Sequence, residues 1–314
     1  MTLSIVIVNW NAGEQLKDCL NSLIKYHSNL IDEVIILDNN SSDDSLKQIF
    51  DIHTKDFKLK IIHSDINLGF GKACNVASEN VTSKYILFLN PDAQIYFDTL
   101  SKVVKYLEEN NDVGVCGIKL IDSYGEIQKH CTVQPQLKHY FNHATGLSTV
   151  LPKLCPYIFL KNFNYEKDAD VPHTIGAFYC IRNKLFKELK GFDEIFFVYL
   201  EDLDLSRRVL QKGFRIHYLS TAAAFHKGGG TSEQVKAFRL FYSLRSRILF
   251  GFKHFPIWQA YTLIVLTFSV ELLTRTIKGL IHFSRTEVCN TLKAYKMLYK
   301  ELHVLVKKGK IIND

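Results

Sequence analysis

The stretch YILFLNPDAQI, residues 85–95, decides the fold prediction because it joins an apolar run to a polar turn. Its first five residues are aromatic, β-branched or aliphatic, which is typical of a buried strand. Pro91 has no N–H and a fixed φ, so we expect the strand to end at Asn90. Asp92 and Gln94 then follow the carboxyl end of a strand, where open α/β sheets bind ligands and where a carboxylate suits a divalent cation. The alternative is an Asx-turn that Asp92 merely caps.

Three further strands are predicted before this stretch, at residues 3–8, 33–37 and 59–64. The first, LSIVIV, is a continuous apolar run, as is typical of a parallel strand buried on both faces. Helical spacing of apolar residues follows at 14–27, and a second helix is expected from about residue 44. The order β-α-β with polar residues at the strand ends is typical of a nucleotide-binding sheet. Those polar residues are Asn9, Asn11, Asp38 and Asn40.

A glycine-containing segment, NLGFGKACNVA at residues 67–77, follows the third strand. Gly69 and Gly71 would let the backbone approach a ligand closely, and a helix starting near Lys72 could direct N–H groups at a phosphate. The pattern lacks the third glycine and the later acidic residue of a dinucleotide-binding motif. A dinucleotide-dependent dehydrogenase is therefore a poor fit.

A group of carboxylates, Glu201, Asp202 and Asp204, stands at the predicted start of a helix, after the aromatic run at residues 196–199. The helix dipole favours their ionised form, and three carboxylates exceed what a simple N-terminal charge cap needs. A strand predicted at residues 215–219 leads to a loop in which His226 precedes three glycines. Such a loop could wrap a diphosphate with His226 as a metal ligand, although a lone histidine is more often structural.

The remaining predicted elements are a helix at residues 100–109 and strands at 113–120 and 174–182, with no element assigned within 121–170. The seven cysteines form no CxxC pair and are odd in number. They are expected to be reduced thiols of a cytosolic protein, and no signal peptide is expected at the start of the chain.

The charge is unevenly distributed, since residues 227–314 hold 15 Lys and Arg against 5 Asp and Glu. This basic tail carries no nucleic-acid-binding motif, so an anionic membrane surface is the favoured partner. Its charge-free core, residues 257–270, is shorter than the about 20 residues that cross a bilayer. Glu271, Arg275 and Lys278 recur on roughly one face, which predicts a helix lying in the membrane plane. Packing on the catalytic domain or on a second subunit is the alternative.

Taken together, these motifs resemble glycosyltransferase family 2, in particular its bacterial rhamnosyltransferase-like members. The resemblance runs in order from residue 3 to about 232 and is carried by VIVNWN, DNNSSDDS, NLGFGKACN, FLNPDAQ, GAF, GFDE-FF-Y-EDLDLSRR and FHKGGGTS. It implies the α/β GT-A fold, a Rossmann-like mixed sheet flanked by helices, in a domain at 1–232. It also implies sugar transfer from a nucleoside-diphosphate sugar with inversion. Residues 233–314 would form a helical C-terminal extension.

The resemblance also implies site roles, residue by residue. Asp202 takes the place of the catalytic base, beside Glu201. Mg²⁺ or Mn²⁺ would be held by Asp92, Gln94 and His226. The donor site would comprise Asn9, Asn11, Asp38, Asn40, Asn67, Gly69, Lys72, Asn75, Asp92 and Gln94. The acceptor site would comprise Gly176, Ala177, Phe178 and Tyr199.

Two positions depart from the family pattern. Gln94 stands where the second aspartate of the metal motif is usual, so it can coordinate only through its carbonyl oxygen or through water. Arg207 adds a cation to which no role is assigned.

The functional hypothesis is a rhamnosyltransferase that uses dTDP-rhamnose and a glycan or lipid-linked acceptor in bacterial surface polysaccharide synthesis, peripheral on the cytosolic face of the plasma membrane. A UDP-hexose donor, a non-catalytic nucleotide-sugar-binding scaffold and a homodimer stay open. A sugar nucleotidyltransferase would need a glycine-rich N-terminal loop with Arg and Lys, which the first residues lack.

Overall fold

The computed structural model describes residues 2–26, 29–52, 54–228 and 235–313. Its contacts divide the chain into two compact units. The first comprises residues 1–133, 160–197 and 201–231, and the second comprises residues 134–159, 198–200 and 232–314. The tail therefore forms most of the second unit, together with two segments from earlier in the chain.

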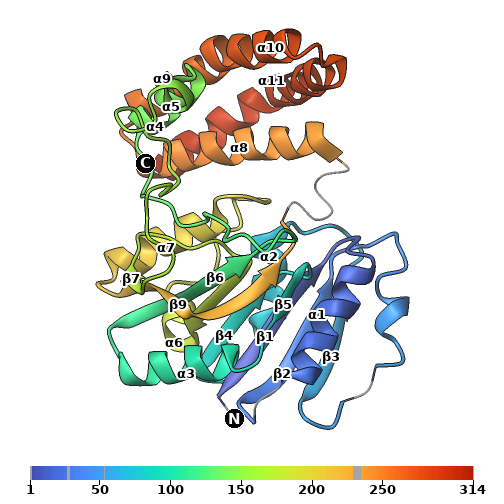
Figure 1. Cartoon of the computed structure of the whole chain (residues 1–314). Coiled ribbons are helices and arrows are strands. Elements are labelled where there is room, and N and C mark those ends of the chain that lie inside the picture. Colours follow the sequence, from blue (N-terminus) through green and yellow to red (C-terminus); the bar gives the residue numbers. More distant parts are fainter. Residues whose placement is uncertain (1, 27–28, 53, 229–234, 314) are drawn as a thin grey trace. The chain divides into compact units, whose positions relative to one another are not determined.

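The first unit is built on one mixed sheet, which has nine strands in the described part of the chain (Figure 1). The order is β3-β2-β1-β4-β8-β6-β9-β5, with β7 paired to β9. Strands β1 to β4 pair in parallel, whereas β8 is antiparallel to both β4 and β6. The strands are β1 Leu3–Asn9, β2 Ile31–Asp38, β3 Lys58–His63, β4 Tyr85–Leu89, β5 Ala93–Ile95, β6 Val113–Ile121, β7 Ala169–Asp170, β8 Phe178–Arg182 and β9 Arg215–His226.

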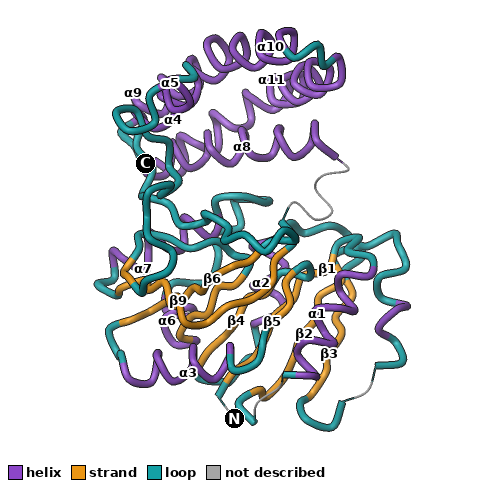
Figure 2. The backbone as a smooth tube through the Cα atoms, viewed as in Figure 1, coloured by secondary structure: helices purple, strands orange, loops and turns teal. Residues whose placement is uncertain are grey.

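Helices cover both faces of this sheet, and strands such as β1 and β4 are buried along their whole length (Figure 2). The apolar faces of α1 (Glu14–Lys25) and α3 (Thr99–Glu109) pack on one side. Helices α2 (Phe70–Ser78), α6 (Asn183–Glu188) and α7 (Glu201–Gln211) pack on the other side. The predicted mixed sheet flanked by helices is therefore confirmed.

Local predictions failed at several places. The helix expected from residue 44 is only a short 3₁₀ turn, Lys47–Ile49, because the polar side chains there bond to the loop itself. Strand β9 continues to His226, since Ala224 and Phe225 pair with β5 and β6, so AAAFH is strand and not loop. The strand expected from residue 174 begins at Phe178.

The second unit is helical in its described part. It contains α4 Leu137–Ala144 and α5 Leu147–Val150, which fall in the segment that the sequence left unassigned. Its tail helices are α8 Lys236–His254, α9 Ile257–Leu266, α10 Leu272–Ile281 and α11 Arg285–Asn313. Pro256 separates α8 from α9, as predicted.

A π-helical turn, Thr267–Glu271, joins α9 to α10 without a break. The apolar core at residues 257–270 is therefore part of one helix spanning Ile257–Ile281, which by length and composition alone could cross a membrane. Glu271 is 2% exposed and bonds to Arg247 and Arg275, so it does not belong to an exposed polar face as the sequence indicated.

Candidate functional site

The turn after β4 carries Asp92, and the pairing of β5 with β9 brings His226 beside it. Ala93 is the register partner of His226, so the residue before Ala93 lies next to the end of β9. Nε2 of His226 is 3.4 Å from Oδ1 of Asp92, and both side chains are 8% exposed. The two residues that the sequence proposed as metal ligands from distant motifs are thus brought together.

Gln94, the third predicted metal ligand, follows Asp92 by two residues and lies in β5, where it is partly buried and is the register partner of Phe225. Its role as a ligand stays a prediction.

The Asp92–His226 pair fits a divalent cation whose remaining ligands the substrate would supply. One carboxylate oxygen and one imidazole nitrogen converge. A carboxylate oxygen suits Mg²⁺ and Mn²⁺, and an imidazole nitrogen suits a transition-metal ion better than Mg²⁺. Within the described ranges no cluster of three or more His, Cys, Asp or Glu could hold a metal ion. Mg²⁺ commonly uses one or two protein ligands and takes the rest from phosphates and water.

Asp202 lies near the amino end of α7, and backbone N–H groups hold both oxygens of its carboxylate. Gly176 donates to Oδ2 at 2.7 Å and Leu203 donates to Oδ1 at 2.8 Å. The side chain of Asp202 is 18% exposed, and Nε2 of His173 lies 3.9 Å from Oδ2. Burial lowers the pKa of His173, which keeps that neighbour neutral. Asp202 is thus an oriented carboxylate with one open side.

Glu201 is in a different environment although it is the adjacent residue. Its side chain is buried, and Oε2 has no hydrogen-bond partner. Burial first, and the charge of Asp202 second, raise the pKa of Glu201 well above its usual value. This environment favours the uncharged form of Glu201.

Two backbone hydrogen bonds connect the Asp92 turn with the base candidate. Asn90 N–H donates to the carbonyl of Ala177 at 3.1 Å, and the next residue back, Gly176, donates to Asp202. Of the four predicted acceptor residues, Gly176 bonds to the base, and Ala177 and Phe178 are buried. Tyr199 has a positive φ of 68° and belongs to the second unit.

The polar residues that follow β1 and β2 bond mostly to one another. Asn9 donates from Nδ2 to Asp38 at 2.7 Å and to Ser45 at 2.8 Å. Asn11 accepts the N–H of Ser42 at 2.7 Å. These predicted donor residues shape the loop after β2, and Asp38 is 6% exposed. Among them Asn40 is exposed, with a φ of 62°.

Asn39 was missed by the sequence interpretation, which chose its neighbour Asn40. Its Nδ2 donates to Asn67 Oδ1 at 3.0 Å and to the carbonyl of Gly69 at 3.2 Å, while its Oδ1 accepts the N–H of Leu68 at 2.7 Å. Asn39 therefore fixes the segment before α2. The only signal in the sequence was its position directly after a strand.

A glycine is required at position 69 by a close contact within the protein. Its φ is +79°, and a Cβ there would lie 2.1 Å from the carbonyl oxygen of Phe197. The next residue, Phe70, donates its N–H to that oxygen at 2.7 Å. The close approach expected for a ligand is thus made by the 191–197 loop.

Lys72 and Asn75 of α2 also contact this loop. Lys72 Nζ lies 3.3 Å from Glu194, with both side chains about half exposed. Asn75 donates to the carbonyl of Phe192 and accepts its N–H, each at 2.9 Å. Asn75 is thus occupied within the protein, whereas Lys72 is free to exchange its exposed partner for an anion.

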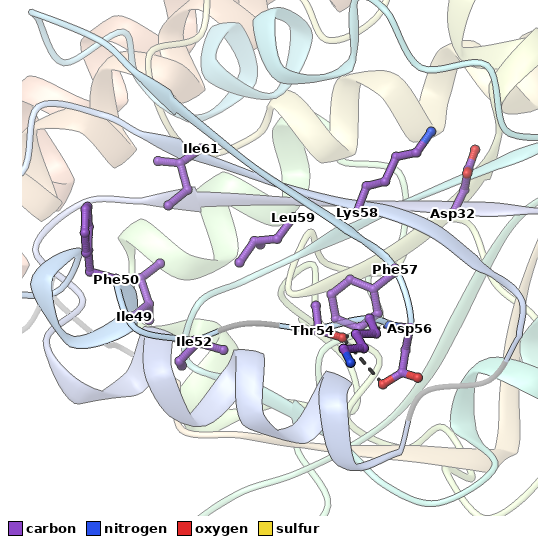
Figure 3. A pocket seen from close by; sticks show the side chains of 11 residues that line it. Asp32, Ile49, Phe50, Ile52, Thr54, Asp56, Phe57, Lys58, Leu59 and Ile61 are labelled. Carbon is purple, nitrogen blue, oxygen red and sulfur yellow. Dashed lines mark hydrogen bonds between the residues drawn. The ribbon is translucent and has the colours of Figure 1, made fainter.

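A cavity of ≈ 710 Å³ lies elsewhere, between β3 and the turn at Lys47–Ile49 (Figure 3). Apolar side chains such as Ile49, Ile52 and Phe57 line it, with Asp56 and Lys58 at its edge. None of the proposed site residues lines it, so it is not the candidate site.

The chain is similar in sequence to known rhamnosyltransferases. The chain is 28% identical over 242 residues to rhamnosyltransferase WbbL of Escherichia coli (strain K12), covering 71% of this chain and 82% of the relative. It is 23% identical over 271 residues to N-acetylglucosaminyl-diphospho-decaprenol L-rhamnosyltransferase of Mycobacterium tuberculosis (strain ATCC 25618 / H37Rv), covering 82% and 87%.

Among solved structures, the mannosyltransferase PcManGT from Pyrobaculum calidifontis in complex with GDP-Man and Mn²⁺ superposes with a TM-score of 0.55 at 14% identity. The match covers 95% of this chain and 86% of that one, and it supports the GT-A type of fold. The profile of "Glycosyl transferase family 2" matches residues 4–189, which include β1 to β4, the Asp92 turn and β8. A profile that spans more than half of the chain, on a sheet of the expected topology, shows that this protein belongs to glycosyl transferase family 2.

Proposed function

We propose that this glycosyltransferase moves rhamnose from dTDP-rhamnose to a lipid-linked glycan acceptor, with inversion at the anomeric carbon, in the synthesis of a bacterial surface polysaccharide. The sugar and the acceptor class rest on the rhamnosyltransferases among its relatives. The observation that carries the chemistry is the oriented, partly open carboxylate of Asp202.

Inversion needs one displacement at the anomeric carbon and one base for the acceptor hydroxyl. The N–H groups of Gly176 and Leu203 occupy one lone pair on each oxygen of Asp202, which leaves the exposed side of the carboxylate to accept the proton. Glu201 is buried in surroundings that favour its uncharged form, so Asp202 is the better placed base. No enzyme nucleophile is required.

Metal dependence is part of the proposal. Asp92 and His226 would hold Mg²⁺ or Mn²⁺, with the donor diphosphate supplying further ligands. When bound, the cation would neutralise charge that develops on the leaving diphosphate. Lys72, at the amino end of α2, would add a positive charge on the same anion.

A thermal-shift screen of nucleotide sugars, with and without Mn²⁺, tests the donor. The true donor stabilises the folded protein by about 2.7 kcal/mol at a concentration of 100 Kd. We expect dTDP-rhamnose to shift the melting temperature more in Mn²⁺ than in EDTA. A larger shift of the melting temperature with a UDP-hexose would mean that the donor is that UDP-hexose and not dTDP-rhamnose.

Turnover and stereochemistry separate an enzyme from a scaffold. With donor and a polyprenyl-diphosphate-linked sugar as acceptor, we expect release of dTDP and a product whose anomeric configuration, read by NMR, is opposite to that of the donor. Binding of donor without transfer or hydrolysis would favour the scaffold. Asp92→Asn should abolish Mn²⁺-dependent nucleotide binding, whereas Gln94→Asp, which adds a charged ligand, should preserve or tighten it. Full activity in EDTA would contradict metal dependence.

We also propose that the second unit binds the cytosolic face of the plasma membrane. Helices α9 and α10 expose large apolar side chains, among them Trp258 at 63%, Val265 at 65%, Leu273 at 60% and Ile281 at 66%. Exposed Lys278 lies on the same continuous helix, within a tail that carries 15 Lys and Arg against 5 Asp and Glu. Apolar and basic side chains together suit an anionic bilayer surface.

Vesicle flotation tests this membrane proposal. We expect the protein to float with vesicles that contain phosphatidylglycerol, less so at high salt, and weakly with neutral phosphatidylcholine vesicles. The pair Val265→Asp and Leu273→Asp should reduce flotation, while Leu292→Asp on α11, a residue that is also exposed, should not. A wild-type protein that stays out of the vesicle fraction at low salt would instead favour a homodimer contact on these helices.

A further inference from the structure

A hairpin that precedes the second unit brings Gln128 against the metal-ligand candidate His226. Strand β6 ends at Ile121, and the turn is closed by Asp122, whose Oδ1 accepts the N–H groups of Tyr124 and Glu126 at 2.9 and 3.0 Å. The returning segment is fixed by a bond from Gln128 N–H to the carbonyl of Leu120 at 2.9 Å. Because β6 pairs with β9 up to Phe225, this places Gln128 next to the end of β9.

The side-chain amide of Gln128 contacts His226 at two points. Its Nε2 donates to the backbone carbonyl of His226 at 2.7 Å, and its Oε1 lies 2.7 Å from Nδ1 of the imidazole. The neighbouring Gly228 has a φ of +72°, and a Cβ there would lie 3.2 Å from Nε2 of Gln128. The backbone around His226 thus leaves room for this two-point contact.

The two contacts determine which ring nitrogen of His226 carries the proton. A backbone carbonyl only accepts, so it must face the amide NH₂ of Gln128. The amide oxygen then faces Nδ1, and since that oxygen also only accepts, Nδ1 must be the donor. In the neutral ring the lone pair is therefore on Nε2, the atom 3.4 Å from Asp92 Oδ1.

We propose that Gln128 is a positioning residue that holds His226 in the Nδ1–H tautomer and directs Nε2 toward Asp92, so that the two can share a divalent cation. The inference rests on the proposed metal-dependent function and adds a residue to it. Partners of this kind typically change metal affinity by about 10- to 100-fold when they are removed.

Three variants test the assignment. Gln128→Leu removes both contacts, Gln128→Glu keeps an acceptor for Nδ1–H but loses the donor, and Gln211→Leu deletes an exposed amide at the end of α7 as a matched control. Mn²⁺ binding is measured by the EPR signal of the free ion in the presence of dTDP. We expect the Mn²⁺ Kd to rise about 10- to 100-fold in Gln128→Leu. It should rise less in Gln128→Glu and stay unchanged in the control.

A second measurement does not depend on metal or activity. Long-range ¹H–¹⁵N spectra of metal-free, histidine-labelled protein report the tautomer of each neutral imidazole, and the His226 signals are assigned by their loss in His226→Gln. We expect the Nδ1–H form in the wild type and a mixture, or the Nε2–H form, in Gln128→Leu. Thermal melts establish that each variant is folded. If Gln128→Leu is unfolded, Gln128→Glu tests the proposal instead, and we expect the Nδ1–H form to persist in it.

An unchanged tautomer in folded Gln128→Leu, or a Kd within twofold of the wild type, would overturn the proposal. If the wild type binds no Mn²⁺ with any nucleotide, the proposed metal dependence fails, and the tautomer spectra alone still decide the role of Gln128.

Discussion

The Oδ2 atom of Asp202 accepts the backbone N–H of Gly176 at 2.7 Å, although the two residues are 26 positions apart in the sequence. Gly176 has no side chain, and a Cβ there would lie 3.4 Å from the same oxygen. The carboxylate is therefore oriented by backbone at a position where a larger residue would crowd it. This contact is the basis for the first prediction.

Asp202→Asn should lower kcat by roughly 10²- to 10⁴-fold, the range expected when a general base is lost. The change keeps the shape of the side chain and removes its basicity. The donor Kd should stay within a few-fold of the wild type, because the nucleotide and metal residues are elsewhere. The measurements are kcat and donor Kd on the same preparation.

Glu201→Gln is the matched control for that experiment, since it changes the adjacent carboxyl in the same way. Because burial favours the uncharged form of Glu201, we expect a smaller loss of kcat in this variant. A severe loss in Glu201→Gln with near-normal kcat in Asp202→Asn would assign the base to Glu201.

Glu201→Gln should also change how stability depends on pH. The folded pKa of Glu201 is raised well above 4.5, so above about pH 4.5 the unfolded chain releases a proton that the folded chain keeps. Wild-type stability therefore carries a cost that grows as pH rises from 4.5 toward the folded pKa. Glutamine does not ionise, so the variant carries no such cost. The unfolding free energy of the variant should therefore rise relative to that of the wild type as pH increases from 4.5 to 8. Urea melts across this range measure it, and parallel curves for the two proteins would contradict the assignment.

Gly69→Ala should destabilise the first unit. A Cβ at this position meets the carbonyl oxygen of Phe197 at 2.1 Å, and φ is +79°. Gly125→Ala is the control, since its φ is +80° and nothing lies within 4 Å of the added carbon. Backbone strain alone costs about 1–2 kcal/mol, so Gly125→Ala should lose that amount and Gly69→Ala clearly more. Chemical denaturation compares the two variants. Equal losses of unfolding free energy would mean that the 191–197 loop moves away from the added carbon at no measurable cost.

The buried ion cluster of the second unit predicts an acid-dependent effect for Glu271→Gln. Burial alone would raise the pKa of Glu271, but the charges and hydrogen bonds of Arg247 and Arg275 lower it from 4.5 to about 2. A depressed pKa contributes stability that is present above pH 4.5 and is lost as pH falls toward 2. Removing one partner of a buried ion pair typically costs about 3–5 kcal/mol.

The gap in stability between wild type and Glu271→Gln should therefore be large at pH 7 and narrow as pH falls below about 4.5. Glu287→Gln, which alters an exposed carboxylate at the start of α11, should show little effect at either pH. A gap that is constant from pH 7 to pH 3 would contradict the low pKa of Glu271.

The family, most of the strands and the main motifs could be predicted from the sequence. Strand β4 is an uninterrupted apolar run, β1 and β2 contain apolar runs at residues 5–8 and 34–37, and α1 and α3 have clear helical spacing. The predictions failed where short-range signals were weak or absent. Residues 222–226 lack the pattern of a strand, and they are strand only because β5 and β6 pair with them.

By itself, the sequence determined which residue types are available at each strand end, because local polarity and period are properties of consecutive residues. Only the tertiary structure decided which of them meet. The register of β5 against β9 brings Asp92 beside His226. The fold also directs Gly69 toward Phe197 and Gln128 toward His226. Such pairings depend on strand register and on loops that return from distant parts of the chain, and a one-residue change in register would reverse every face.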